Sequence, residues 1–248
     1  MPAQAQTILA LDTALGACSV AIWQDGRILA SAHERRQTGH AEALMPMISK
    51  VCDEAGLALA DIDLFAVTQG PGTFTGLRIG LAAARGLAQA LDRPLIGFST
   101  LETIGWGSLA ALPASPKMAH LVVVHDARRG EVYAQSFAIE QDSVGPALAA
   151  MSPPTLLEQD RVEAFLPTKP TWLVGSGAAL VAATLAGGRA AVVPDAPANP
   201  DAAVLAALAA RRFDAGSTPH PRHYLDTPPL TPIYLRAPDA KLPGGATV

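Results

Sequence analysis

The sequence has few cysteines and little net charge. Cys18 and Cys52 are the only cysteines, and they form no C-x-x-C pair. Two thiols so far apart do not make a disulfide framework, so we expect both to be reduced and buried. The formal net charge is −4. A protein that binds nucleic acid unaided normally has a strong basic excess, so any contact with RNA is expected to be shared or indirect.

Long apolar runs are absent as well. No stretch approaches the roughly 18 consecutive apolar residues that a membrane span needs. Residues 1–7 lack the basic start and the apolar run of a signal peptide. The chain is therefore expected to be cytoplasmic, with no membrane contact.

Catalytic and metal-binding motifs are also missing. The histidines form no H-x-x-x-H or H-E-x-x-H pattern, and no G-x-S-x-G nucleophile motif occurs. His120 and His125 are five residues apart on a predicted strand, so the two-residue period directs them to opposite faces of a sheet. His220 and His223 have no nearby third ligand, and Ser176 is interpreted as a turn residue. The sequence therefore predicts neither a catalytic residue nor a metal site.

What the sequence does contain is apolar residues in short, regular runs. Half of the residues are hydrophobic and 16% are charged, which indicates a well-packed protein. The Asp25-Gly26 dipeptide between two apolar runs is a strong hairpin signal. The prolines at residues 113–116 suggest a boundary between one domain at 1–112 and another at 113–248. Strands are predicted at residues 8–12, 18–23, 27–32, 64–68, 95–98, 121–126, 131–139, 172–174, 190–193 and 233–236.

Helical spacing of the apolar residues predicts five helices. They lie at residues 40–55, 77–91, 100–106, 178–185 and 201–213. His40 is interpreted as a residue that begins the first helix. Pro46 cannot donate to the carbonyl of Glu42, so it either kinks this helix or lies in its first turn. The proline-rich residues 218–232 are expected to lack regular structure, and residues 238–248 to be loose.

A glycine-rich segment precedes the second predicted helix. Closely spaced Gly70, Gly72 and Gly76 leave backbone N–H groups free to approach an anion at a helix N-terminus. A Walker A loop is excluded because Leu77 and Arg78 follow the last glycine, where that loop has a lysine and a hydroxyl residue. A dinucleotide loop is disfavoured because no acidic residue ends the next predicted strand. The alternative is that the glycines only permit a sharp turn and tight packing.

The helix after this segment carries small residues spaced by four, namely Gly76, Gly80, Ala84 and Ala88, which would let another helix come close. It is apolar over more of its surface than its own sheet can cover. Either the preceding helix or a partner subunit covers the remainder. The residues predicted to form such a helix-to-helix interface are Leu44, Met47, Ile48, Val51, Gly76, Gly80, Ala84, Leu87 and Ala88. We expect the same surface to support a homodimer when no partner is present.

Several blocks resemble one family in sequence and in order. They are residues 8–19 (ILALDTALGACS), 40–46 (HAEALMP), 69–80 (QGPGTFTGLRIG), 126–133 (DARRGEVY) and 232–236 (PIYLR). Together they resemble the TsaB family, also called YeaZ. The resemblance implies an α/β, actin-like or Hsp70-like ATPase (ASKHA) fold of two related subdomains.

The resemblance also gives a meaning to the candidate phosphate loops. Asp12 falls where nucleotide-using members of that superfamily place a phosphate-loop aspartate. Asp12, Gly70, Gly72 and Gly76 are therefore candidates for degenerate phosphate loops. No cofactor of the chain's own is expected, although ATP or ADP could bind at a degenerate site or at one shared with a partner.

The family implies a role in tRNA modification. TsaB proteins are not thought to catalyse; they pair through their first two helices with their paralogue TsaD, which transfers a threonylcarbamoyl group to tRNA adenosine. TsaE is the ATP-hydrolysing third component, and tRNA would be contacted indirectly. Two alternatives remain open. One is an independent ATP-dependent kinase-like enzyme that uses Asp12 to hold Mg-ATP, and the other is a glycopeptidase-like protein of the same superfamily.

Overall fold

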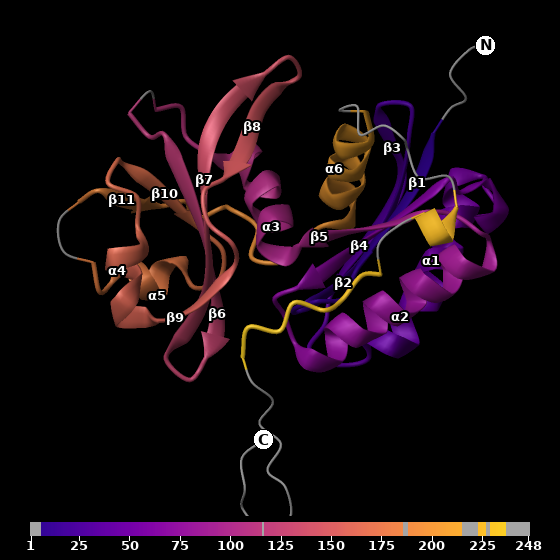
Figure 1. Cartoon of the computed structure of the whole chain (residues 1–248), viewed down its shortest axis with the longest axis horizontal. Helices are drawn as coiled ribbons and strands as arrows, with labels where there is room; N and C mark the ends of the chain where they lie inside the picture. Colours follow the sequence, from indigo (N-terminus) through magenta and orange to yellow (C-terminus); the bar gives the residue numbers. More distant parts are fainter. Residues whose placement is uncertain (1–5, 116, 186–187, 215–222, 227–228, 237–248) are drawn as a thin grey trace, which may run out of the picture.

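Two β-sheets form the framework of the molecule. The structure is a computed structural model that describes residues 6–115, 117–185, 188–214, 223–226 and 229–236. The strand order is β3-β2-β1-β4-β5 in the first sheet and β11-β10-β6-β7-β8 in the second, with β9 paired to β7 (Figure 1). The strands are β1 (Thr7–Asp12), β2 (Ala17–Gln24), β3 (Arg27–Arg35), β4 (Leu64–Gly70), β5 (Leu95–Ser99), β6 (His120–Arg128), β7 (Glu131–Asp142), β8 (Gly145–Ala150), β9 (Thr155–Glu158), β10 (Thr171–Val174) and β11 (Ala190–Val192).

The two sheets share one topology. In the first, β1, β2 and β3 form an antiparallel meander, and β4 and β5 extend the sheet parallel to β1. In the second, β6, β7 and β8 form the meander, and β10 and β11 extend it parallel to β6. The hairpin openings predicted near residues 8 and 121 thus begin two equivalent units. The molecule has an actin-like α/β fold of two related subdomains, as the sequence resemblance implied.

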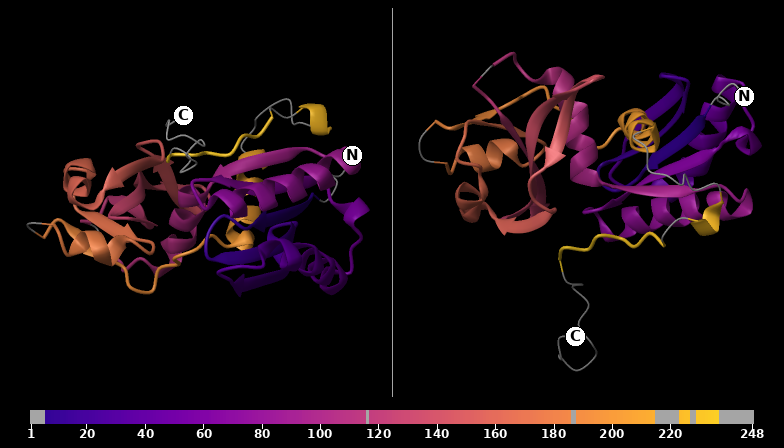
Figure 2. Two further views of the ribbon diagram at one scale, coloured as in Figure 1. Left: turned by 90° about the horizontal axis from the view of Figure 1, so that it is seen from below. Right: turned by 45° about the horizontal axis from the view of Figure 1, so that its top comes forward.

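Helices cover both faces of the first sheet. The helices of the molecule are α1 (His40–Ala55), α2 (Phe74–Ala90), α3 (Thr100–Ser108), α4 (Val162–Phe165), α5 (Ala178–Ala182) and α6 (Ala202–Asp214). Leu9 and Leu11 of β1 pack in the core beneath α1 and α2, whereas Ile8 and Ala10 of the same strand pack with α6. Figure 2 shows α3 and α6 between the two sheets. Such double coverage explains why β1 reads as a continuous apolar run.

Most predicted elements are present within a few residues of their expected limits. The Asp25-Gly26 turn joins β2 to β3 with φ angles of 46° and 86°, as a tight two-residue hairpin requires. β3 continues to Arg35, beyond the predicted end at residue 32. Pro46 lies inside α1 and not in its first turn, on the exposed side of the helix. The carbonyl of Glu42 therefore lacks its usual helical donor.

Some boundaries differ from the prediction. α2 begins at Phe74 and not at Leu77, because the Thr73 hydroxyl caps it by accepting a hydrogen bond from the Gly76 N–H at 3.1 Å. α5 ends at Ala182, before the predicted end at residue 185. Three elements, β8, β9 and α4, were not predicted. They are short or lack an alternating apolar pattern, so the sequence gives no periodic signal for them.

Helix α6 packs on the first sheet, although it lies late in the chain. Leu205, Ala206 and Ala209 pack against Ile8 and Ala10 of β1 in one buried cluster. The α6 N-terminus is fixed there because the Ala202 N–H donates to the Ser19 hydroxyl at 3.0 Å. The predicted division at residues 112 and 113 falls between β5 and β6, and α6 follows it in the sequence while packing on the first sheet. Helical periodicity shows which face of α6 is buried, and it does not show which sheet buries that face.

The last described residues run in an extended path along the first sheet and contain no assigned strand between 229 and 236. The strand predicted at residues 233–236 is therefore wrong. The segment nevertheless docks, because the Ile233 N–H donates to the Gln69 carbonyl at 2.6 Å. The predicted loose end at residues 238–248 lies outside the described residues.

Candidate functional site

The glycine-rich segment packs directly against the β1–β2 loop. The Thr73 N–H donates to the Ala14 carbonyl at 2.8 Å. A Cβ atom added to Gly72 would lie 2.5 Å from the Ala14 oxygen, and one added to Gly76 would lie 2.1 Å from the Thr13 oxygen. The backbone of the glycine-rich segment and that of the β1–β2 loop are thus so close that a side chain at Gly72 or Gly76 would collide with the loop. These contacts support the packing interpretation of the glycines.

Gly70 has a different neighbour. Its φ angle is 119°, and a Cβ atom there would lie 2.6 Å from the Ile233 oxygen of the C-terminal segment. Glycine is needed at this position both for its φ angle and for the close approach of the passing chain. Ala14, Thr13 and Ile233 therefore occupy the immediate surroundings of the three glycines.

Asp12, the candidate phosphate-loop aspartate, is fully buried. Its Oδ1 atom accepts hydrogen bonds from the Thr68 hydroxyl and, at 3.2 Å, from the Ala14 N–H. Burial raises the pKa of the carboxyl from 3.8 to about 7; the two hydrogen bonds oppose this rise, and the nearby charge of Asp201 adds to it. In this arrangement Asp12 is sealed within the protein, and contact with a magnesium nucleotide would require the β1–β2 loop to move.

His40 begins α1, as predicted. It is buried, and its Nε2 atom lies 3.1 Å from the Leu15 carbonyl of the β1–β2 loop. The first helix is thereby tied to the same loop that contacts the glycine-rich segment. Among the described residues, no group of three His, Cys, Asp or Glu side chains is placed to hold a metal ion.

The predicted interface residues are mostly part of the chain's own core. Leu44, Met47, Ile48 and Val51 are at most 4% exposed, and they pack between α1 and the first sheet. On α2, Leu87 is partly exposed. The other four predicted residues of this helix are buried: Gly76, Gly80, Ala84 and Ala88. The alternative of burial within the chain is therefore correct for eight of the nine residues, and these eight do not form an exposed surface.

The exposed side of α2 carries a different row of residues, also spaced by four. These residues are Phe74, Arg78, Ala82, Gly86 and Ala90. A Cβ atom on Gly86 would meet nothing within 4 Å. A glycine inside a helix costs about 1 kcal/mol relative to alanine, and no contact among the described residues accounts for Gly86. We call this row the α2 outer face.

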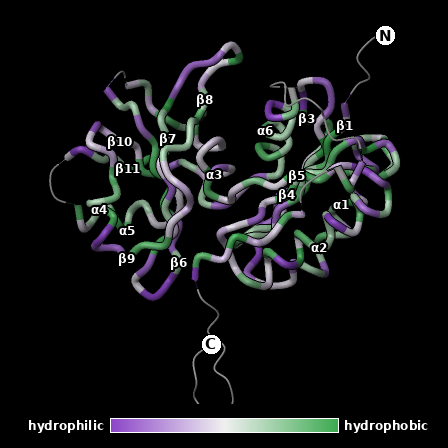
Figure 3. The backbone as a smooth tube through the Cα atoms, viewed as in Figure 1, coloured by the Kyte–Doolittle hydropathy of each residue, from purple (hydrophilic) through white to green (hydrophobic). Residues whose placement is uncertain are grey.

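α1 lies beside α2 and exposes a surface of opposite charge. Its exposed residues include the acidic Glu42, Asp53 and Glu54 as well as Met45, which is 47% exposed. α2, in contrast, contains two arginines and no acidic residue. Both helices show alternating hydrophobic and hydrophilic segments in Figure 3. α1 also exposes Lys50, which lies 3.7 Å from the Glu54 carboxylate, so its exposed side carries a net negative charge next to the two arginines of α2.

The structure brings together one polar pair that the sequence did not suggest. The Ser176 Oγ atom lies 2.9 Å from the His125 Nδ1 atom and accepts a hydrogen bond from the Asp126 N–H at 3.1 Å. Fifty-one residues separate the serine from the histidine, so no local motif could reveal them. Burial lowers the pKa of His125 to about 4, so this imidazole is neutral and a weak base. The pair is better suited to hold two loops together than to activate a nucleophile.

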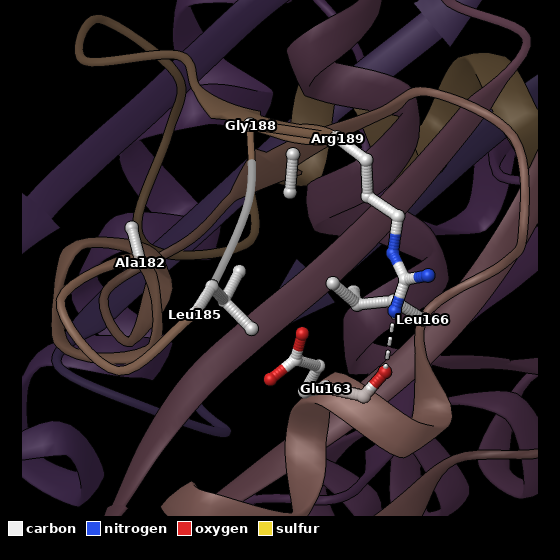
Figure 4. Close-up of a pocket in the computed structure, with 7 residues that line it drawn as sticks. Glu163, Leu166, Ala182, Leu185, Gly188 and Arg189 are labelled. Carbon is white, nitrogen blue, oxygen red and sulfur yellow. Dashed lines mark hydrogen bonds between the residues drawn. The ribbon is translucent and has the colours of Figure 1, made fainter.

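Among the described residues, cavities are found in the second half, away from the glycine-rich segment. The smaller has a volume of about 90 Å³ beside α4 and α5, where Arg189 donates to the Glu163 carbonyl at 3.2 Å (Figure 4). The larger is an open groove of about 780 Å³ beside Ser176, lined by alanine, valine, glycine and proline residues. Neither includes a residue of the predicted phosphate loops. Among the described residues, no helix is long and apolar enough to cross a membrane.

Two sheets of equal topology with α3 and α6 between them define the class, an actin-like ATPase fold. A family model described as "TsaD: tRNA N6-adenosine threonylcarbamoyltransferase" matches residues 31–240. YeaZ from Pseudomonas aeruginosa has a similar structure, with a TM-score of 0.75 and 31% identity over 93% of this chain and 100% of that chain. The chain therefore belongs to this family, and within it to the TsaB proteins, which are also called YeaZ.

Two relatives in sequence agree with this assignment. The "tRNA threonylcarbamoyladenosine biosynthesis protein TsaB" of Escherichia coli K12 is 40% identical over 138 residues, which is 55% of this chain and 57% of that protein. The chain thus matches little more than half the length of this relative. An uncharacterized protein of Mycobacterium tuberculosis H37Rv, Rv3421c, is 32% identical over 247 residues, which is 96% of this chain and 95% of that protein.

Proposed function

We propose that this chain is a non-catalytic subunit in the formation of threonylcarbamoyladenosine in tRNA. In this proposal it docks on a TsaD-type transferase through the exposed sides of α1 and α2 and activates that enzyme in the cytoplasm. The name of the Escherichia coli relative supports the pathway. The observation that carries the docking role is the α2 outer face, whose Gly86 has no packing partner in the part of the chain that the structure describes.

The α2 outer face fits a helix of another subunit. Ala82, Gly86 and Ala90 leave it flat over several turns, so the axis of a second helix can come close. Phe74 and Arg78 at its N-terminal end belong to residue types that often dominate interface energies. α2 carries arginines and no acidic residue, which favours an acidic partner helix. The acidic residues on the exposed side of α1 favour a basic one.

The same charge pattern allows self-association. If two copies meet with α1 of one against α2 of the other, acidic residues face arginines twice, as a two-fold interface requires. We therefore propose a homodimer through this surface when the TsaD-type partner is absent. TsaE would act as the ATP-hydrolysing component, and tRNA would be contacted through the assembled complex, since the net charge of this chain is −4.

A nucleotide would bind, in this proposal, at a surface shared with the partner. Asp12 is sealed by Thr68 and the β1–β2 loop, and Gly72 and Gly76 are in contact with that loop. These contacts favour a role for the glycine-rich segment in positioning α2, and they give no support to an independent kinase-like or glycopeptidase-like activity.

The test is reconstituted tRNA modification by the cognate TsaD-type enzyme, supplied with preformed threonylcarbamoyl-adenylate, with and without this chain. Activity is expected only with both proteins. Gly86→Arg places a long charged side chain on the α2 outer face and should abolish the stimulation. Ala179→Arg, at an exposed position on α5, is the matched control and should not. Modification that does not depend on this chain, or ATP turnover by the chain alone, would contradict the proposal.

A further inference from the structure

Residues 229–236, which we call the C-terminal strap, contact both halves of the molecule. Figure 1 shows this segment running alongside α2 and ending near β6. Upstream of it, the Tyr224 N–H donates to the Asp92 carboxylate at 3.3 Å, just after the end of α2. The chain thus passes α2 from its C-terminal to its N-terminal end before it reaches the second half.

The strap is held closely against the first sheet. The Ile233 N–H donates to the Gln69 carbonyl at 2.6 Å, and the Ile233 backbone lies against Gly70, where a Cβ atom would not fit. Leu230 packs against the first-sheet core, and a Cβ atom on Gly97 would come within 3.0 Å of it. Backbone and side-chain contacts together fix this part of the strap at the end of β4.

Tyr234 connects the strap to the first turns of α2. Its ring stacks on Phe74 with a centroid distance of 5.4 Å and an interplanar angle of 29°. The Arg78 guanidinium lies 3.6 Å from the centroid of the Phe74 ring, and its Nε donates to the Tyr234 hydroxyl at 3.0 Å. Three side chains therefore form one cluster, which is held by a stacking contact, a cation–π contact and a hydrogen bond.

Arg236 extends the strap to the second sheet. Its guanidinium forms an ion pair with Glu131 at the start of β7 and donates to the Arg128 carbonyl at 3.4 Å. The Arg236 and Glu131 side chains are only 25% and 30% exposed, so water screens this pair less than it screens a fully exposed one. One short segment thus joins the end of β4 and the start of α2 to the β6–β7 turn.

We propose that the C-terminal strap holds the two halves in one relative orientation and thereby fixes the first turn of α2 relative to the second sheet. Without it, the halves are joined by the chain connections next to α3 and α6, by the packing of those helices between the sheets, and by a buried cluster in which Leu15 and Leu77 meet residues of the second sheet. The Ser99 hydroxyl also donates to the Gln135 side chain of β7 at 3.0 Å. The strap adds a link beside α2, so its loss should release rotation of one half against the other. A further part of the inference rests on the proposed function: a fixed first turn of α2 presents Phe74 and Arg78 to the partner in a preorganised position.

The first test measures the orientation of the halves by pulsed electron spin resonance on the full-length chain. Spin labels are attached at Ser49→Cys on α1 and Val144→Cys in the β7–β8 turn, both exposed. The native Cys18 and Cys52 are buried, and burial raises the pKa of both thiols, so they react slowly. The double variant Tyr234→Ala/Arg236→Ala should broaden the distance distribution, whereas Leu225→Ala, at a residue that is 88% exposed, should not.

The outcomes separate the strap from the proposed function. If the folded double variant shows the same distance distribution as the parent, the proposed role of the C-terminal strap is wrong, whether or not the partner binds. If the distribution broadens, the affinity for the TsaD-type partner should fall about tenfold, because binding must then restore the lost order. An unchanged affinity would overturn the link between the strap and docking. Absence of partner binding by the unmodified chain would overturn the proposed function alone.

Discussion

The Oδ1 atom of Asp12 accepts a hydrogen bond from the Thr68 hydroxyl, while its Oδ2 atom is buried with no hydrogen-bond partner among the described residues. A charged carboxylate in this position is unfavourable, which is why burial raises the pKa of Asp12 to about 7. The Ala14 N–H of the β1–β2 loop also donates to this carboxyl group, and the Ala14 carbonyl accepts a hydrogen bond from the Thr73 N–H of the glycine-rich segment. The candidate phosphate-loop aspartate is therefore part of the core.

The stability of the protein should depend on pH through Asp12. The unfolded chain loses this proton near pH 3.8 and the folded chain near pH 7, so between these values the folded state binds more protons. The free energy of unfolding therefore falls as pH rises through this window, by at most about 1.4 kcal/mol per pH unit from this group. Urea unfolding at several pH values should show a smaller fall for Asp12→Asn than for the parent. The control is Asp195→Asn, at an exposed carboxylate, which should keep the parent's pH dependence.

Two glycines on α2 should respond in opposite ways to alanine. Gly86→Ala should stabilise the isolated chain by about 0.5–1 kcal/mol, because the new methyl group meets nothing and the unfolded chain loses freedom. Gly76→Ala should destabilise it by about 2 kcal/mol or more, because the methyl group would lie 2.1 Å from the Thr13 oxygen. Chemical denaturation of both variants checks this pair. Equal effects would show that the close contact of Gly76 with the β1–β2 loop is absent in solution.

Arginine substitutions on α2 distinguish its exposed side from its buried side. Ala82→Arg should leave the melting temperature nearly unchanged and should prevent self-association, measured by light scattering of the isolated chain. Ala84→Arg should instead unfold the protein, since Ala84 is completely buried and cannot accommodate a charged side chain. A dimer of Ala82→Arg as tight as that of the parent would place the self-association surface elsewhere.

Removal of Leu205 from α6 should weaken the first sheet and leave the second intact. Leu205→Ala deletes a fully buried side chain that packs with Ile8 and Ala66, and we expect a loss of about 2–5 kcal/mol. Hydrogen exchange should increase in β1 and β2 and stay unchanged in β10 and β11. Leu180→Ala, at a partly exposed position of α5, serves as the control for a surface leucine.

Local features of the fold could be predicted because local chemistry decides them. The Asp25-Gly26 turn, the start of α1 at His40 and the strand that leads into the glycine-rich segment are all encoded within a few residues. The sheet that α6 covers is decided by contacts between residues nearly two hundred positions apart, such as Ser19 and Ala202, and no periodicity reports such a contact.

The sequence does not distinguish the exposed side of α2 from the buried side, for a geometric reason. The buried row at Gly76, Gly80, Ala84 and Ala88 and the exposed row at Phe74, Arg78, Ala82, Gly86 and Ala90 both have a spacing of four residues. Two positions along a helix correspond to about 200°, so the rows lie on opposite sides. Both are rich in alanine and glycine, and contacts distant in sequence, such as those of Thr13 with Gly76 and Gly80, show which side faces inward.

The equal strand order of the two halves contrasts with the unequal length of their helices. The first half carries outer helices of 16 and 17 residues, whereas α4 and α5 of the second half have 4 and 5. In the described part of the chain, the long outer helices thus belong to the first half, although the strand order is repeated in the second. If the chain docks as proposed above, assembly through α1 and α2 should end at a pair, because a chain needs two such surfaces to grow into a filament.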